Sequence, residues 1–301
     1  MASRIGIGLL VWNGEKTIRT TINSLLKQTL QTFDLIIFDN RSTDQTLKIA
    51  KEIKKINKTK IKIKIIKDYK RRNLVNSQKF LIKNYLRKYK YICVISDDDF
   101  YHPKFLETIH KKITNDKLSM VYCGHNYFNS KNNFYKAKNY PIYDQSSSYF
   151  YNLSKFVLHR NMVPAFFGIF LSKEYINSLK YFYYYDKTES NYDTLFLAHF
   201  LLNNKVGYIK KNLFSYRDKD RYKIQKTRNH KVYLLAELKT CLFILFYQFN
   251  LSKYLTKITF ENNNINFFEK NKILILIVIT YFQKSFSFIL RRLYGLFKIS
   301  E

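Results

Sequence analysis

The chain has 301 residues, 46% of them hydrophobic, so it can bury a sizeable core as one large domain or as one domain with an appendage. Its 7 glycines, 3 prolines and lack of an internal repeat exclude a low-complexity or repeat-built filament. The net charge of +31 indicates either an acidic partner or a strongly solvated basic surface.

Apolar runs and helical patterns alternate through the first hundred residues. Strands are predicted at 4–11, 33–38, 60–66 and 91–95, and helices at 16–29, 45–55 and 75–88. This order predicts a doubly wound, mostly parallel α/β sheet with flanking helices. The run 60–66 alternates lysine with isoleucine, which is typical of a half-exposed strand whose lysines protect a sheet edge.

Polar side chains follow three of these strands at the point where each strand ends. In doubly wound sheets, ligands bind at the carboxyl ends of the strands, so these groups predict a site on one rim. They are Asn13, Glu15, Asp39, Asn40, Asp97, Asp98 and Asp99.

The three consecutive aspartates repel one another unless a cation lies among them. Carboxylate oxygens suit Mg²⁺ or Mn²⁺, and a cation held in this way keeps positions open for substrate phosphates. The alternative is a solvated acidic turn, because Asp is common at turns and helix caps. A helix is expected after Pro103, a few residues beyond the three aspartates. No GxGxxG, phosphate-loop, HExxH or Cys/His cluster is present.

The positive charge is carried by 41 lysines and 12 arginines that are spread over the whole chain. Polycations bind nucleic acid by releasing counterions, but lysine lacks the bidentate fork with which arginine reads guanine. We therefore expect a solvated basic surface first, an anionic membrane surface second, and no nucleic-acid partner.

The cysteines and the N-terminus bear on localisation. Cys93, Cys123 and Cys241 lie far apart and outside any CxxC spacing, as expected of reduced core thiols in a cytosolic protein. The first residues run straight into a predicted strand, so no signal peptide is expected. We predict a cytoplasmic protein, with the inner face of the plasma membrane as a peripheral location.

The second half continues the alternation less regularly. A strand is predicted at 118–124, a long polar loop at 126–152, a strand at 161–170 and a helix running through residue 202.

Residues 273–282 form an apolar run that is too short to span a bilayer alone. Beyond it, basic residues recur every seven positions on one helical stripe, and apolar residues lie opposite. The basic positions are Lys284, Arg291 and Lys298, and the apolar positions are Phe286, Ile289, Leu290, Leu293 and Phe297. Such a helix either lies in an anionic membrane interface or packs onto the core.

Four segments in order resemble one known family. The sequence Ile7-Gly8-Leu9-Leu10-Val11-Trp12-Asn13 is similar to an opening strand with a Pro-x-Tyr-Asn turn, with Leu10 and Trp12 replacing Pro and Tyr. Leu25-Leu26-Lys27-Gln28-Thr29 resembles "SLxxQT", and Phe38-Asp39-Asn40-Arg41-Ser42-Thr43-Asp44 resembles "VDDGSTD" with Asn40 at the second acidic position. Ser96-Asp97-Asp98-Asp99-Phe100-Tyr101-His102-Pro103 resembles "DxDD…P". Together, over about residues 4–217, they resemble the family 2 inverting nucleotide-sugar glycosyltransferases of the GT-A type.

The resemblance implies roles for the polar residues at the strand ends. Val11, Asn13 and Glu15 would line the nucleotide pocket, with Asp39 accepting a hydrogen bond from the base and Asn40 beside it. Asp97 and Asp99 would form the acidic pair around Mn²⁺ or Mg²⁺. Because Ser96 stands where many members have the first Asp, Asp98 is an equal candidate, and all three are kept as metal and diphosphate ligands.

Two further positively charged positions would meet the diphosphate. Arg217, in the closing Tyr216-Arg217 pair, matches the family's "YR". Arg71, with its neighbours Lys70 and Arg72, follows the predicted edge strand and could add charge there, or could belong to a solvated loop. A cation stabilises the charge that builds up on the leaving diphosphate more in the transition state than in the ground state.

An inverting transfer needs a carboxylate that takes the proton from the acceptor hydroxyl. Family members carry this base in a Glu-Asp or Tyr-Asp pair before a helix, and Tyr192-Asp193 matches. Asp193 is therefore the predicted general base, with Glu189 and Asp186 in reserve. The alternative is a helix N-terminal Asp that the helix macrodipole stabilises.

The sequence thus predicts a GT-A catalytic domain at 1–220 and a helical, basic tail at 221–301. The donor would be a nucleotide sugar, most readily a UDP-sugar, and the acceptor a glycan or a lipid-linked hydroxyl. Two alternatives stay open. One is a polybasic nucleic-acid- or membrane-binding protein on a degenerate transferase fold, and the other is a nucleotidyltransferase.

Overall fold

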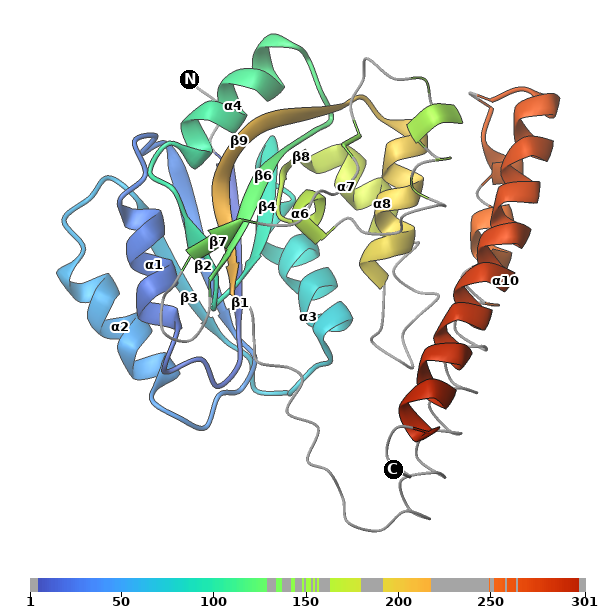
Figure 1. The fold of residues 1–301 in the computed structure, drawn as a ribbon. Helices are drawn as coiled ribbons and strands as arrows, with labels where there is room; N and C mark the ends of the chain where they lie inside the picture. Colours follow the sequence, from blue (N-terminus) through green and yellow to red (C-terminus); the bar gives the residue numbers. More distant parts are fainter. Residues whose placement is uncertain are drawn as a thin grey trace. The chain divides into compact units, whose positions relative to one another are not determined.

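The structure is a computed structural model, shown in Figure 1. It describes residues 5–128, 134–136, 142–143, 148, 150–152, 154, 156, 163–179, 192–217, 249, 252–257, 259–263 and 265–297. The chain divides into two compact units. The N-terminal unit comprises Met1–Ser147 with Asn161–Asp220, and the C-terminal unit comprises Ser148–Arg160 with Arg221–Glu301.

Four parallel strands form the first half of the sheet in the N-terminal unit. Their order is β3-β2-β1-β4, which confirms the predicted doubly wound arrangement. The strands are β1 (Ile5–Val11), β2 (Phe33–Asp39), β3 (Lys62–Lys67) and β4 (Tyr91–Ser96). In the described part of the chain β3 lies at the edge, as its alternating lysines predict.

The second half of the sheet is mixed, and it lies beyond β4 in the order β8-β6-β9-β5, with β7 paired to β6. Its strands are β5 (Phe100–Tyr101), β6 (Met120–Phe128), β7 (Phe134–Lys136), β8 (Ile169–Leu171) and β9 (Val206–Arg217). β8 runs antiparallel to both β4 and β6, whereas β6 and β9 are parallel.

Two sequence predictions in this half were wrong in detail, and one strand was not predicted. The unpredicted strand is β5, which lies between the three aspartates and the helix expected after Pro103, because residues 100–101 pair with β9. The strand predicted at 161–170 is replaced by the helical turn α6 (Val163–Phe166) and the short β8. The polar segment 126–152, predicted as a loop, contains the end of β6 and the strand β7.

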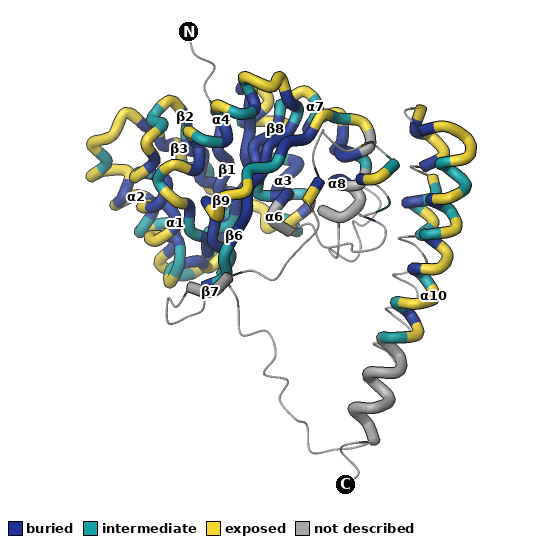
Figure 2. The backbone as a smooth tube through the Cα atoms, turned by 45° about the horizontal axis from the view of Figure 1, so that its top comes forward, coloured by how far each residue is buried: buried dark blue, intermediate teal, exposed yellow. Residues whose placement is uncertain are grey.

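Helices cover both faces of the sheet (Figures 1 and 2). One face carries α1 (Ile18–Leu26), α2 (Thr46–Ile56) and α4 (Phe105–Asn115), whose apolar residues join the core cluster with β1, β2 and β4. The other face carries α3 (Leu74–Leu81), which continues into one π-helical turn, η1 (Ile82–Leu86). Gly8 is needed there, because a Cβ atom would overlap the side chains of Leu81 and Leu86.

An aromatic cluster holds α7 (Ser172–Ser178) and α8 (Tyr192–Asn203) to the sheet. The ring of Phe196 lies 4.6 Å from that of Tyr175 and 5.8 Å from that of Phe170, measured between centroids. All three side chains are buried. Aromatic pairs at this spacing add to the energy of area burial, so the position of α8 is well determined by packing.

The C-terminal unit is described mainly through α10 (Phe267–Phe297). Ile273 and Ile277 are buried on one side of this helix. The opposite side exposes Phe268, Ile275, Ile279, Phe282 and Phe286, which are spaced so that they share one helical face. Among the helices that the structure describes, none has the length and apolarity that crossing a bilayer requires.

Candidate active site

The carboxyl ends of β1, β2 and β4 bring the predicted polar residues together on one rim. The backbone N–H of Asn40, after β2, donates to the carbonyl of Val11 at the end of β1, over 2.9 Å. The carboxylate of Asp97, after β4, lies directly against Gly14, where a Cβ atom would overlap its Oδ2. Glycine fits at position 14 because the acidic segment occupies the space that a side chain would need.

Asn13 and Glu15 join the loop after β1 to the loop after β2. The Asn13 side-chain oxygen accepts a hydrogen bond from the backbone N–H of Thr43 over 2.9 Å. Glu15 Oε2 accepts one from the N–H of Gln45 over 3.1 Å. Asn13 has a positive φ of 50°, a conformation that Asn tolerates better than most residues. Both predicted nucleotide-pocket residues thus also fix the shape of the rim.

Asp44 completes this connection at the N-terminus of α2. Its carboxylate accepts hydrogen bonds from the N–H groups of Thr46 (3.0 Å) and Glu15 (3.1 Å). Burial alone raises the pKa of Asp44, but these hydrogen bonds outweigh it and the pKa is lowered. The loop is therefore held by an ionised carboxylate at neutral pH.

Asp39 is buried at the end of β2, with 1% of its surface exposed. Its Oδ1 accepts a hydrogen bond from the N–H of Ser42 over 3.3 Å. Its Oδ2 is buried and receives no hydrogen bond from any residue that the structure describes. A buried carboxylate oxygen without a donor is costly, so this atom is suited to accept a hydrogen bond from a ligand.

Asn40 binds the loop that follows β3. Its amide nitrogen donates to the carbonyl of Arg72 over 2.8 Å, and its amide oxygen accepts from the N–H of Arg72 over 2.9 Å. A carboxylate could accept the second bond but could not donate the first. This explains why Asn stands at the second acidic position of the family pattern.

The three basic residues of that loop have different surroundings. Arg71 stacks on Trp12, with its guanidinium carbon 3.7 Å from the ring centroid. Arg72 forms an ion pair with Asp68 over 2.7 Å and lies over the ring of Phe80. Lys70 is exposed. Arg71 is therefore the arginine of this loop that lies next to the end of β1, where Trp12 is 46% exposed.

Arg217, at the end of β9, contacts the acidic segment. Its backbone N–H donates to Oδ1 of Asp99 over 3.1 Å, and its Nε donates to the carbonyl of Asp98 over 3.0 Å. Its guanidinium also lies 4.3 Å from the ring centroid of Phe128. These contacts place the guanidinium beside the aspartates, where it offsets part of their mutual repulsion.

The three aspartates differ in burial. Asp99 is fully buried and Asp98 is 8% exposed, whereas Asp97 is half-buried. Among the described residues, no three His, Cys, Asp or Glu side chains are arranged to hold a metal ion together. The oxygen donors of Asp97 and Asp98 nevertheless fit a hard divalent cation that also takes ligands from a diphosphate. The carboxylate of Asp99 is engaged by the N–H of Arg217.

One face of α1 holds the acidic segment in place, a role that the sequence did not predict, although Gln28 belongs to the segment that resembles "SLxxQT". The hydroxyl of Thr21 donates to the carbonyl of Asp99 over 2.7 Å, and Ser24 Oγ accepts from the N–H of Tyr101 over 3.3 Å. Gln28 accepts from the N–H of Leu106 at the start of α4 and donates to the carbonyl of His102. Buried polar residues at this helical spacing were the available signal.

The proposed base lies at the start of α8. Asp193 is the second residue of this helix, as the sequence predicts, and its side chain is outside the described part of the structure. The reserve candidates Asp186 and Glu189 also lie outside the described residues.

The fold and this rim define the class of protein. A mixed, mostly parallel sheet with helices on both faces and an acidic segment after β4 is the architecture of the GT-A glycosyltransferases. The family profile "Glycosyl transferase family 2" matches residues 7–179, more than half of the chain. The chain therefore belongs to glycosyl transferase family 2 and is a glycosyltransferase, as the sequence motifs predict.

Solved structures support the fold assignment. A crystal structure of Staphylococcus aureus TarS 1-349 in complex with UDP-GlcNAc is 15% identical with a TM-score of 0.64, and the match covers 93% of this chain and 73% of that one. The same fragment in complex with UDP is 15% identical with a TM-score of 0.62, at 93% and 72% coverage. A longer TarS structure gives a TM-score of 0.61, at 93% and 43% coverage. No curated protein matches the chain.

Proposed function

We propose that the protein transfers a sugar from a nucleotide diphosphate donor to a hydroxyl group, with inversion at the anomeric carbon. The observation that carries the donor assignment is the buried Oδ2 of Asp39, which receives no hydrogen bond from any described residue. A nucleobase N–H would supply the missing donor. The TarS crystals contain UDP and UDP-GlcNAc, which favours a UDP-sugar.

The diphosphate would lie between the acidic segment and two arginines. Asp97 and Asp98 would hold Mn²⁺ or Mg²⁺, which supplies positive charge to the diphosphate. Asp99 is the third sequence candidate, and its contact with Arg217 suits it to holding the segment in place. Arg71 and Arg217 would add hydrogen-bond donors to the phosphates. Val11, Asn13, Glu15 and Asn40 would shape the rim around the nucleotide.

Asp193 would remove the proton from the attacking hydroxyl. Its place in the first turn of α8 lets the helix N-terminus stabilise its ionised form, which is the form that a base needs. The aromatic packing of Phe196 fixes this helix against the sheet, so Asp193 is carried by a rigid helix. The acceptor would be a glycan or a lipid-linked hydroxyl.

The apolar face of α10 would lie in a membrane interface. The sequence predicted Phe286 on an apolar face opposite Lys284, and the structure exposes 65% of Phe286 while Lys284 is half-buried. Arg291, Ile289, Leu290, Leu293 and Phe297 have side chains outside the described part, and Lys298 lies outside it altogether.

We expect the double substitution Ile279→Asp with Phe282→Asp to abolish binding to zwitterionic vesicles. Phe260→Asp, outside α10, is the matched control.

Donor binding can be tested by thermal unfolding. Thermal unfolding would be followed with a panel of nucleotide sugars and Mn²⁺, because a ligand that binds only the folded state raises the midpoint. We expect UDP-sugars to raise it, and Asp39→Asn to remove the increase. Asp116→Asn, at an exposed aspartate of the same unit, should leave the increase intact. Activity that consumes a nucleoside triphosphate and releases pyrophosphate would instead indicate a nucleotidyltransferase.

A further inference from the structure

The lysines of the N-terminal unit are concentrated along α2 and β3. Ten of the 25 residues from 46 to 70 are lysines, and all ten are exposed. Eight of them lie on α2, between α2 and β3, or at and just after the end of β3; they are called the lysine face, and they are Lys48, Lys51, Lys54, Lys55, Lys58, Lys60, Lys67 and Lys70. Lys62 and Lys64 alternate with Ile63 and Ile65 along β3, and Lys64 lies over the ring of Tyr85, on the side of the sheet that carries η1. The sequence alone indicated a charge spread over the whole chain. The fold instead gathers this part of it on one helix and one edge strand.

The acidic residues of the same segment do not neutralise the lysine face. Glu52 pairs with Arg19 over 3.1 Å, and Asp68 pairs with Arg72 over 2.7 Å. These are the acidic residues of 46–70, and both are engaged by arginines. No ion pair links any lysine of the face to another described residue. The face therefore presents a strong, uncompensated positive potential.

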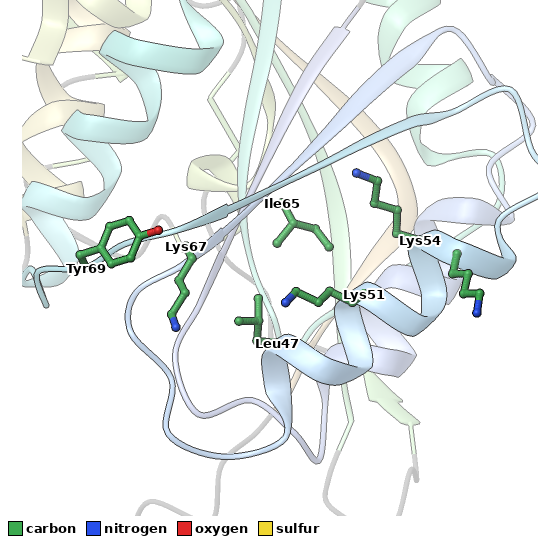
Figure 3. A pocket seen from close by; sticks show the side chains of 7 residues that line it. Leu47, Lys51, Lys54, Ile65, Lys67 and Tyr69 are labelled. Atoms are coloured by element: carbon green, nitrogen blue, oxygen red, sulfur yellow. The ribbon is translucent and has the colours of Figure 1, made fainter.

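A hollow of about 580 Å³ opens in the middle of this face. Leu47 and Ile65 give it an aliphatic lining between α2 and β3. Its other lining residues are Lys51, Lys54, Lys55, Lys67 and Tyr69. In Figure 3, Lys51 from α2 and Lys67 from β3 flank Leu47, with Tyr69 beyond Lys67. The hollow thus combines several ammonium groups with an apolar interior.

The lysines on α2 also repel one another. Lys51 is three residues from Lys54 and four from Lys55, so these side chains are neighbours on the helix surface. Like charges at this spacing destabilise a helix, and a bound anion would remove that cost. The arrangement is therefore better suited to an anion-bound state than to a free one.

We propose that the lysine face binds the phosphate headgroups of an anionic membrane, independently of the transfer reaction. Two exposed apolar residues lie among the lysines, Tyr69 at 85% and Ile56 at 68% exposure. At a bilayer surface such side chains enter the headgroup region, while lysine stems lie along it with their ammonium groups on the phosphates. Anionic lipid adds a favourable term for each lysine near the surface.

The composition of this segment favours a membrane over the other polyanions. Residues 46–70 contain no arginine, the residue that clamps phosphate and stacks on bases in nucleic-acid interfaces. The exposed Tyr69 and Ile56 add apolar side chains, which a bilayer surface takes up and a nucleic-acid backbone does not.

The test is co-sedimentation of the full chain with two kinds of vesicle. One is phosphatidylcholine alone, and the other contains roughly 30 mol% phosphatidylglycerol, so that each basic residue near the surface adds to the free energy of binding. The variant replaces Lys51, Lys54 and Lys67 with Gln. We expect its partitioning onto the anionic vesicles to fall on the order of 100-fold, with binding to neutral vesicles unchanged. The substituted side chains are exposed, so circular dichroism should show an unchanged fold.

The matched control replaces Lys27, Lys104 and Lys111 with Gln, which removes the same charge from exposed positions outside the lysine face. An equal loss in the control would mean that net charge alone drives binding, and would overturn the proposal. So would tighter binding of the wild type to duplex DNA or heparin than to the anionic vesicles. No sugar transfer is measured, so the result is independent of the proposed reaction.

Discussion

Asn40 and Arg72 form a reciprocal pair of hydrogen bonds, with the Asn40 side-chain amide bound to both the carbonyl and the N–H of Arg72. This pair fixes the loop that carries Arg71 against the end of β2. It also accounts for the chain's departure from the acidic family pattern at position 40. The residue that differs from the family is thus the one that holds the loop carrying Arg71 next to the rim at the strand ends.

Asn40→Asp should destabilise the protein, although it restores the family pattern. The new carboxylate would lie 2.8 Å from the carbonyl oxygen of Arg72, with no hydrogen to donate. Leaving this buried acceptor unsatisfied costs about 1–3 kcal/mol. Urea unfolding would measure the loss, with Asn115→Asp as an amide-to-acid control at an exposed position. Equal midpoints for the wild type and Asn40→Asp would show that the pair contributes nothing.

Thr21→Val should weaken the support of the acidic segment. Valine has nearly the same shape, but it cannot donate the hydrogen bond that Thr21 makes to the carbonyl of Asp99 over 2.7 Å. We expect the free energy of unfolding to fall by about 1–2 kcal/mol. Thr20→Val, at the exposed neighbouring position, carries the same propensity change and serves as the control. A matching loss in both variants would assign the effect to helix propensity.

The sequence predicted the first half of the fold well because its signals are local and strong. The runs 5–11 and 33–38 are wholly or mostly apolar, and each is followed by a polar turn and an amphipathic helix. Arg217 was predicted from the family resemblance, whereas the gathering of Asn13, Asp39 and Asp97 on one rim followed from the rule that parallel strands share a carboxyl edge. That rule requires no knowledge of side-chain geometry.

The features that the sequence did not predict depend on long-range contacts, which hydrophobic periodicity does not reveal. The strand β5 is two residues long and exists because β9, more than a hundred residues later, pairs with it. The roles of Thr21 and Gln28 appear only when α1 is placed under the acidic segment. The two hydrogen bonds between the Asn40 amide and Arg72 could not be inferred without knowing that the loop at 68–72 lies beside Asn40.

His125 should make stability depend on pH in the acid range. Burial lowers the pKa of this imidazole to about 4, from a usual value near 6.5. The unfolded chain therefore takes up a proton at higher pH than the folded one. Keeping His125 neutral contributes fully to the free energy of unfolding above pH ~6.5, and this contribution is lost as the pH falls toward ~4. The free energy of unfolding lost over this range is on the order of 3 kcal/mol.

His125→Phe should flatten this part of the profile, because phenylalanine keeps an aromatic ring beside Tyr127 and Phe214 without titrating. The measurement is the urea midpoint at several pH values between 4 and 7. The exposed His102, replaced by Gln, is the control and should retain the wild-type profile. If the Phe variant lost stability over the same range as the wild type, other groups would be responsible.

The three aspartates should separate into two kinds. Asp99→Ala removes the acceptor for the N–H of Arg217, so the free energy of unfolding should fall by about 1–3 kcal/mol. Asp97→Ala and Asp98→Ala each remove one of the two carboxylates that we propose as cation ligands. These two should instead lower Mn²⁺ affinity at least tenfold, as measured by electron paramagnetic resonance of free Mn²⁺. Undiminished Mn²⁺ binding by Asp98→Ala would contradict its role as a ligand.

Asp193→Asn tests the base apart from donor binding. The amide cannot take a proton from the acceptor hydroxyl, so kcat should fall by about 10²- to 10⁴-fold. The residues that we propose to line the nucleotide pocket lie at the ends of β1 and β2, and none of them belongs to α8, so the thermal shift produced by UDP should persist. Asp116→Asn, at the end of α4, controls for the loss of one negative charge in the same unit. A loss of UDP binding together with activity would show that the substitution disturbs the fold, and full activity would move the base to Asp186 or Glu189.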